Sequence, residues 1–468
     1  MSLPMSQDRF EELLNEHVRP SRAIESIEHL FDRERQLNRI EEALSSPGRH
    51  VFIYGDRGAG KTSLARTAAF KHHPSDGEPV YSACGQQTTF SAIVRDIASQ
   101  LDERSHLRNT DKTLSAGAKA NIRGFGVEGS YSEKETLREL TGLDLNAATA
   151  AIREAAQKRP GRSVVVVDEF ENLPSVEDRH LFAELIKQLS DRGVPVSLIF
   201  CGIGESLEDL LKGHNSAQRY IEEVQLPSPP LSYTGRWAII DAACEALGLT
   251  LNSDSRLRIA QVSDGFPHYV HLVSQKIFWG AFRAAEEVRE LTPEDYMEAV
   301  REALGSVESR LRSAYDVATK KDQDTYQEVL WAVADHFELE RNNRRIYSDS
   351  YLRVMADVQR PPLSFDDFQA RLSNLRNARH GGVLRSDRRG WIRFNENLLR
   401  GYVRLVAESK GVRLALEHER GPEPKALTAS ARSARSAGID PAFPRSNYGR
   451  PKFERDEEKQ FPSPSASL

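Results

Sequence analysis

Residues 55–62 form a phosphate-binding pattern. They read Gly-Asp-Arg-Gly-Ala-Gly-Lys-Thr, which fits the spacing G-x-x-x-x-G-K-[ST]. In such a loop, glycine-rich backbone lets successive N–H groups converge on phosphate oxygens at a helix N-terminus. We therefore expect a nucleotide to contact the whole loop: Gly55, Asp56, Arg57, Gly58, Ala59, Gly60, Lys61, Thr62 and Ser63. Lys61 would reach the β- and γ-phosphates and Thr62 would offer its hydroxyl to Mg²⁺, so ATP and Mg²⁺ are the expected cofactors.

Two acidic residues supply the second half of this chemistry. The run Val164–Val167 is rich in β-branched residues and predicts a buried strand, which ends in Asp168 and Glu169. In P-loop enzymes an acid at this place holds the metal opposite the Ser or Thr of the loop. Asp168 is therefore expected to share the metal site with Thr62. Glu169 is expected to polarise the attacking water as general base, with Lys61 beside it, so the predicted activity is ATP hydrolysis.

The surrounding sequence alternates strand and helix signals. Apolar runs at Val51–Tyr54 and Val194–Cys201 predict further strands, and residues 61–72 follow a helical period. This alternation predicts an α/β fold with a three-layer parallel sheet. Helical signals alone continue from about Pro227 to Val317. Residues 105–135 break the pattern and are interpreted as an insertion, for which a hairpin is one option.

A basic segment lies near the C-terminus. Between residues 341 and 404 there are fourteen arginines, no lysine and six acidic residues, a net charge of +8. The whole chain carries −5, so the remainder carries −13. Ser364 has the position of a helix cap, and Phe365, Phe368, Leu372 and Leu375 form an apolar stripe behind it. Gly381 and Gly382 end this helix, and residues 387–390 predict the turn of a hairpin.

Composition excludes several classes of protein. Of the 468 residues, 39% are hydrophobic and 28% are charged, which is typical of a globular protein with a core. No apolar run reaches membrane-spanning length, and the polar N-terminus is no secretory signal. Three separated cysteines, Cys84, Cys201 and Cys244, suggest reduced thiols in a cytoplasmic protein. The residues after Gly421 are rich in Pro, Ser, Ala and Arg, and we expect a disordered tail.

These motifs together resemble a known family. Residues 31–37 (Phe-Asp-Arg-Glu-Arg-Gln-Leu), the phosphate-binding loop and residues 164–173 look like an AAA+ ATPase of the initiator type, similar to origin-recognition-complex-type ATPases and their bacterial relatives. The resemblance implies an AAA+ core, an all-helical lid and a C-terminal winged helix. The expected boundaries are a polar leader at 1–23, the core at 24–228, the lid at 229–319, the winged helix at 320–412 and the tail at 413–468.

The resemblance also implies roles for single residues. Leu30 and Phe31 would contact the adenine. Arg219 lies where the family places an arginine finger that reaches a neighbouring subunit, which would require a homo-oligomer; the alternative is an ordinary surface arginine. His268 stands where relatives often have a phosphate-sensing arginine; the alternative is a packed histidine at a helix start. In Cys201–Ser206, where the first sensor belongs, no residue stands out.

The winged helix would be the part of the ATPase that binds its partner. We expect its arginines to contact duplex DNA: Arg371, Arg376, Arg385, Arg388, Arg389 and Arg393. The alternative is a signalling or defence-type ATPase whose winged helix binds a protein partner. A metabolic kinase fits poorly, since such enzymes seldom need a lid, a basic winged helix and a tail. No membrane partner is expected.

Overall fold

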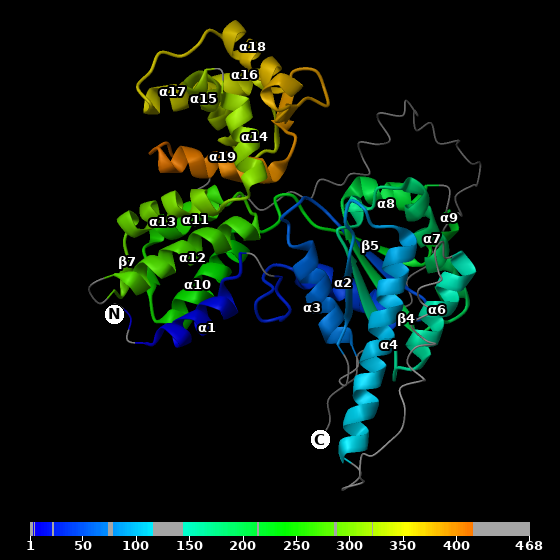
Figure 1. Ribbon diagram of the computed structural model, residues 1–468. Helices are drawn as coiled ribbons and strands as arrows, with labels where there is room; N and C mark the ends of the chain where they lie inside the picture. The colour runs from blue at the N-terminus through cyan, green and yellow to red at the C-terminus, as the bar shows by residue number, and fades with distance from the viewer. Residues whose placement is uncertain are drawn as a thin grey trace, which may run out of the picture. The chain divides into compact units, whose positions relative to one another are not determined.

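A parallel sheet of five strands carries the N-terminal half of the protein in the computed structural model (Figure 1). The model describes residues 3, 5–20, 23–73, 78–115, 144–212, 215–284, 288–320 and 322–414. All of them belong to one compact unit. The spatial order is β2-β3-β4-β1-β5, and every neighbouring pair is parallel. The strands span β1 (His50–Tyr54), β2 (Val80–Ala83), β3 (Ser163–Asp168), β4 (Val196–Gly202) and β5 (Ile221–Gln225).

Helices cover both faces of this sheet, which explains why strand β3 is apolar from Val164 to Val167. Val164, Val165, Val166 and Val167 are all buried, and they divide alternately between the hydrophobic clusters on the two faces. The helices of this region are α2 (Glu34–Ser45), α3 (Lys61–His72), α4 (Phe90–Ser115), α6 (Leu145–Gln157), α7 (Val176–Asp191), α8 (Gly204–Leu211) and α9 (Asn215–Gln218). The predicted three-layer α/β core is therefore confirmed.

A helical lid follows the sheet. It contains α10 (Tyr233–Leu247), α11 (Ser253–Val262), α12 (Pro267–Arg283), α13 (Pro293–Ser306) and α14 (Ser309–Thr319). One short parallel pair, β6 (Thr250–Leu251) with β7 (Glu290–Leu291), is its only strand structure among the described residues. The N-terminal helix α1 (Gln7–His17) packs on the lid, where Phe10 contacts the rings of Trp279 and Phe282. Part of the expected polar leader is thus built into the lid.

The C-terminal region mixes helices with a small antiparallel sheet. Its strand order is β8-β10-β9. In chain order the elements are α15 (Gln323–Ala334), β8 (Glu340–Asn342), α16 (Asn343–Arg345), the π-helix η2 (Ile346–Tyr351), α17 (Leu352–Asp357), α18 (Phe365–Leu375), the 3₁₀ turn η3 (Ala378–His380), β9 (Leu384–Arg385), β10 (Trp391–Phe394) and α19 (Asn397–Ser409). The lid and this region share one hydrophobic core.

Two local predictions for this region are confirmed. Ser364 caps α18, because its Oγ accepts the N–H of Asp367 at 3.1 Å. The hairpin forms between β9 and β10, with Arg385 opposite Arg393. Gly381 ends the preceding turn with a φ of +73°, a conformation that costs glycine little. The expected insertion lies mostly outside the described residues, apart from the end of α4, and the expected tail from residue 415 on lies wholly outside them.

Candidate functional site

The phosphate-binding loop joins β1 to α3 at the carboxyl edge of the sheet. Gly58 and Gly60 have φ values of +74° and +90°, which lets the chain turn tightly before α3 begins at Lys61. The Lys61 ammonium donates to the carbonyls of Gly55 and Asp56, at 3.1 Å each. The loop is therefore shaped for an anion at the N-terminus of α3, with the lysine folded over it.

Thr62 and Asp168 meet as predicted. The Thr62 hydroxyl donates to Asp168 Oδ2 at 2.7 Å, and Asp168 Oδ1 accepts the N–H of Glu169 at 2.8 Å. A hydroxyl and a carboxylate are oxygen donors that suit Mg²⁺. The described residues contain no cluster of three or more His, Cys, Asp or Glu side chains that would hold a metal alone. A magnesium ion here would therefore share its ligands between these two residues and phosphates.

Glu169 is held in a strained position. Its backbone is left-handed, with φ of +53°, which is uncommon for a residue other than glycine. The amide of Asn172 donates to Glu169 Oε2 at 3.0 Å, so the candidate base is restrained by a residue three positions later. Sequence reasoning missed Asn172, although it lies in the same motif, because its role depends on the 3₁₀ turn η1 (Phe170–Asn172).

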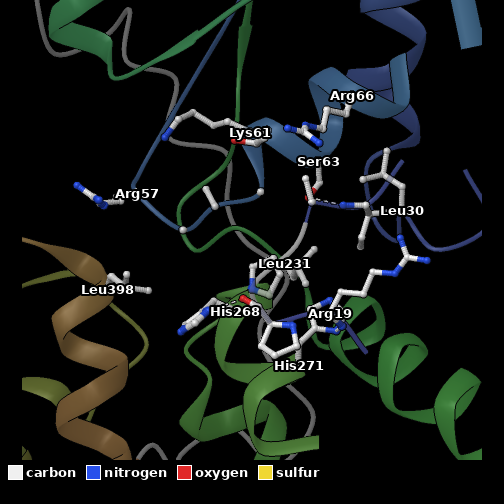
Figure 2. A pocket seen from close by; sticks show the side chains of 18 of the residues that line it. Arg19, Leu30, Arg57, Lys61, Ser63, Arg66, Leu231, His268, His271 and Leu398 are labelled. Carbon is white, nitrogen blue, oxygen red and sulfur yellow. Dashed lines mark hydrogen bonds between the residues drawn. The ribbon is translucent and has the colours of Figure 1, made fainter. Parts of the chain in front are cut away.

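A cavity of about 720 Å³ opens beside the loop (Figure 2). Asp168, Glu169 and His268 line it, together with Leu30 and Phe31, which were expected at the adenine. The phosphate-binding loop contributes Arg57 to Ser63 to its wall. Its volume suits a nucleoside triphosphate, since ligand pockets usually measure about 300–1,000 Å³. The structure thus brings the predicted nucleotide residues to a single cavity, apart from Gly55 and Asp56.

Asp56 faces the C-terminal region. Its Oδ2 accepts from the Asn397 amide at 2.9 Å and from the Ser228 hydroxyl. Leu398 lies 3.0 Å from the point that a Cβ on Gly58 would occupy. The Asp56 carboxylate is thus engaged by the start of α19, and the prediction that Asp56 contacts the nucleotide as part of the loop stays a prediction. The contacts with Asn397 and Leu398 span more than 300 residues of sequence, so no local signal could have revealed them.

Arg33 connects the phosphate-binding loop to the lid, and the sequence analysis did not predict this role. It is 2% exposed and donates to the carbonyls of Ala59, at 3.1 Å, and Pro230, at 2.7 Å. Burial lowers the pKa of Arg33 to about 10, which leaves it charged at neutral pH. The preceding Asp32 accepts the N–H of Ser232 at 2.7 Å, at the start of α10. Asp32 and Arg33 therefore connect the phosphate-binding loop, on one side of the cavity, to the residues at the start of α10 on the other side.

The two sensor positions differ in their surroundings. His268 lies in the first turn of α12 and lines the cavity, and its Nδ1 lies 3.0 Å from the carbonyl of Pro20. At the first sensor, the Ser206 hydroxyl closes the turn that starts α8 by bonding the backbone of Ile203. The Cys201 thiol is buried under the loop, and burial raises its pKa well above the ordinary value. Neither Ser206 nor Cys201 therefore offers a free polar group at the first sensor position.

Arg219 does not line this cavity. Its side chain is 64% exposed, stacks on the Tyr220 ring and lies 3.8 Å from Asp191. A role at a γ-phosphate would therefore require a second copy of the chain, as the finger prediction assumes.

The C-terminal arginines divide into buried and exposed sets. Arg341, Arg400 and Arg404 are at most 3% exposed. Asp264 bonds to both Arg400 and Arg404, at 3.0 and 2.9 Å. Part of the local charge of +8 is therefore neutralised inside the protein and is not available at its surface.

The predicted DNA residues lie on α18 and the hairpin. Arg376, Arg379 and Arg389 are exposed. Arg371 lies 3.5 Å from Asp322, Arg393 lies 2.6 Å from Asp387, and Arg385 lies 3.8 Å from the same carboxylate. Arg388 stacks on Trp391, 3.3 Å from the ring centre, with Glu340 at 3.7 Å. Sequence reasoning missed Arg344 and Arg345, which are exposed beside this hairpin, where the N–H of Asn343 donates to the Gly390 carbonyl.

Two chemical properties complete the description. Cys84, Cys201 and Cys244 are free and buried. No helix among the described residues combines the length and the apolar character that crossing a bilayer requires.

Comparison with known proteins agrees with the fold. The solved structure of a Walker-type ATPase of Pyrococcus abyssi superposes with a TM-score of 0.50 at 15% identity, covering 82% of this chain and 99% of that chain. Orc2 of Aeropyrum pernix, in ADPNP and ADP complexes, gives a TM-score of 0.47 at 14% identity, covering 87% and 100%. Cdc6p of Pyrobaculum aerophilum gives 0.41 at 16% identity, covering 86% and 99%. A search of curated proteins found no match.

A family model matches the N-terminal part of the chain. Residues 29–199 match the model described as the AAA ATPase domain. This range contains the phosphate-binding loop, both acids of β3 and most of the five-stranded sheet. The matched segment thus agrees with the P-loop AAA+ fold that the structure shows.

Proposed function

We propose that this protein is an ATP-binding and ATP-hydrolysing molecular switch that couples its nucleotide state to duplex DNA binding or partner recruitment. The observation that carries the proposal is the convergence of Lys61, Thr62, Asp168 and Glu169 on one cavity that has room for a nucleotide. Each of these side chains has the chemistry that phosphoryl transfer needs.

Each of these residues has a separate role in ATP binding and hydrolysis. Lys61 and the loop N–H groups hold the phosphates, and Thr62 with Asp168 provides oxygen ligands for Mg²⁺. Magnesium, when bound, supplies positive charge that neutralises the phosphates. Glu169 takes the proton of the attacking water once it is free to turn toward it. Because Asn172 donates to Glu169 at 3.0 Å, we expect slow hydrolysis until that hydrogen bond opens.

Two variants test the enzyme. Lys61→Ala should remove ATP binding, measured by calorimetry, because the phosphates lose their principal cation. Glu169→Gln should keep binding and lose most turnover, measured as phosphate release. Unchanged turnover in Glu169→Gln would exclude it as the base, and unchanged binding in Lys61→Ala would exclude this cavity as the ATP site.

The C-terminal region is proposed to be a winged helix. Its element order supports this: a helix, a strand, two helical segments and a β-hairpin, with the three strands in one antiparallel sheet. In this interpretation α18 is the reading helix and residues 386–390 form the tip of the wing. Exposed Arg376, Arg379 and Arg389 are placed to contact phosphates.

An anisotropy titration with labelled duplex DNA tests this interpretation. Binding at low salt should weaken steeply as salt rises, because each phosphate contact releases counterions. Arg388→Ala combined with Arg389→Ala should weaken it further, while Arg353→Ala, which removes an arginine paired with Asp335 and Asp357, serves as the matched control. Absence of binding at low salt would contradict the DNA interpretation.

A second candidate is a signalling ATPase whose winged helix binds protein, in a cytoplasmic setting that the three free thiols would suit. One observation favours it: acidic side chains already pair with Arg371, Arg385 and Arg393. Turnover that rises on adding duplex DNA would support the first function, and turnover indifferent to DNA would support the second.

Arg219 is proposed to act in trans in an oligomer. Its exposure supports this, since a finger must protrude. Arg219→Ala should lower turnover only at protein concentrations where subunits associate. A wild-type rate at high concentration would exclude the finger.

A further inference from the structure

The first turn of α19 contacts the phosphate-binding loop directly. The Asn397 amide donates to Asp56 Oδ2 at 2.9 Å, and the Ser228 hydroxyl lies beside both side chains. Leu398 lines the nucleotide cavity (Figure 2), and its Cδ1 lies 3.0 Å from the point that a Cβ on Gly58 would occupy. We call Asn397 and Leu398 the latch, because these two residues join the C-terminal region to the loop.

The latch is firmly attached to the lid. The Tyr269 hydroxyl donates to the carbonyl of Leu398 at 2.8 Å, and Tyr269 is fully buried. Further along α19, Arg400 and Arg404 bond to Asp264 just before α12 begins, at 3.0 and 2.9 Å. Separating a buried ion pair is costly, because it leaves a charge without a partner in the interior. We therefore expect α19 and the lid to move together.

The attachment of α19 to the sheet is weaker. The buried apolar residues of α19 belong to the hydrophobic core shared with the lid, and no described residue of α19 belongs to the two clusters on the faces of the sheet. The latch contacts the loop through a half-buried hydrogen bond and one leucine side chain. A hydrogen bond to a charged group changes an equilibrium constant by roughly 10- to 100-fold. A contact of this strength can open without unfolding either part.

Asp56 lies between the latch and the phosphate site. Its carboxylate accepts from the Asn397 amide, and its backbone carbonyl accepts from the Lys61 ammonium at 3.1 Å. A nucleotide needs the N–H groups of the loop in one conformation, with Lys61 free to reach the phosphates. Asn397 restrains the side chain of Asp56 and Leu398 covers Gly58, so the latch stabilises one conformation of the loop.

We propose that the latch controls how long a nucleotide stays bound: dissociation is slow while Asn397 and Leu398 contact the loop, and the nucleotide leaves when α19 moves away. The inference rests on the proposed ATP binding and adds its regulation by the C-terminal region. Asn397 acts through Asp56 and is therefore a positioning residue. Because coupling between two sites is reciprocal, a bound nucleotide also favours the closed latch. A partner that draws the C-terminal region away from the loop speeds nucleotide exchange.

An exchange of the two paired side chains tests the latch. The dissociation rate is measured by stopped flow, with fluorescently labelled ADP displaced by excess ADP, because ADP avoids turnover. Asn397→Asp places two carboxylates against each other and should release labelled ADP about tenfold faster than wild type. In the Asp56→Asn background the same change restores an amide opposite a carboxylate and should give no acceleration. Equal accelerations in both backgrounds, or none in the wild-type background, would overturn the proposal.

Controls separate added charge, misfolding and the proposed function from the inference. Asn395→Asp adds the same charge two residues earlier, on an exposed residue, and should release labelled ADP at the wild-type rate. Misfolding caused by Asn397→Asp would not be repaired by Asp56→Asn, so slow release by the double variant excludes it. If Lys61→Ala binds labelled ADP as wild type does, the proposed function fails. If Lys61→Ala loses labelled ADP while Asn397→Asp releases it at the wild-type rate, only the latch fails.

Discussion

The nucleotide cavity and the C-terminal region use charged side chains in different ways. In the cavity, the polar groups of Lys61, Thr62, Asp168 and Glu169 line one opening and are held by few partners. In the C-terminal region, Arg341, Arg400 and Arg404 are buried and several exposed arginines pair with acids of the same chain. The comparison teaches that a short motif with fixed spacing identifies a site, whereas a count of charges does not identify a surface.

The largest effect should come from the buried arginines. Arg400 bonds to Asp264 and to the carbonyls of His336, Phe337 and Glu338. Arg400→Ala would leave Asp264 without one of its two buried partners, which typically costs about 3–5 kcal/mol. Chemical denaturation should therefore show a large loss of unfolding free energy. Arg376→Ala, on the surface, should change it by less than about 0.5 kcal/mol; equal losses would refute the division into buried and exposed sets.

The second-largest effect is expected on ATP turnover in the nucleotide cavity. Glu169→Gln should slow ATP turnover by about 100-fold or more at unchanged ADP affinity, because a positioned general base contributes roughly that much. Asn172→Ala should instead keep or raise turnover, because it frees the Glu169 carboxylate. Phosphate release measured for both variants checks this, and a collapse of turnover in Asn172→Ala would show that the amide positions the base for reaction.

Buried histidines should make stability depend on pH. Burial lowers the pKa of His50 to about 3, and its Nδ1 accepts the N–H of Leu198 at 3.0 Å. Below pH 6.5 the unfolded chain binds a proton at His50 that the folded chain does not, so stability falls as pH falls toward 3. The slope is about 1.4 kcal/mol per pH unit for this one group. Urea titrations from pH 7 to 4 should show it, and His50→Gln should flatten the curve.

The smallest effect should come from the exposed arginines beside the hairpin. Arg344→Ala combined with Arg345→Ala should reduce the slope of log affinity for DNA against log salt by up to about 1.8, since each phosphate contact contributes about 0.9. Folding stability should stay within about 0.5 kcal/mol of wild type. An unchanged salt slope would remove these two residues from any DNA surface.

The sequence predicted strands β1, β3 and β4, the phosphate-binding loop, the Thr62–Asp168 contact, the Ser364 cap and the β9–β10 hairpin. Each depends on hydrophobic period, glycine geometry or residues a few positions apart, except for Thr62 with Asp168. That pair could be predicted because parallel strands end at the same edge of the sheet. The partners of Glu169 and Asp56 were missed, because Asn172 acts through a local turn and Asn397 comes from a distant helix.

By itself, then, the sequence determined the phosphate-binding loop and predicted a site for phosphates and Mg²⁺, because contiguous residues set the backbone geometry that such a site needs. Only the tertiary structure decided which arginines are available to a partner and which are buried and paired with Asp264. It also placed His271 on the wall of the cavity, where its Nδ1 accepts the N–H of Arg19 across 252 residues. Contacts at such separations arise from the packing of whole elements, which no local pattern of residues encodes.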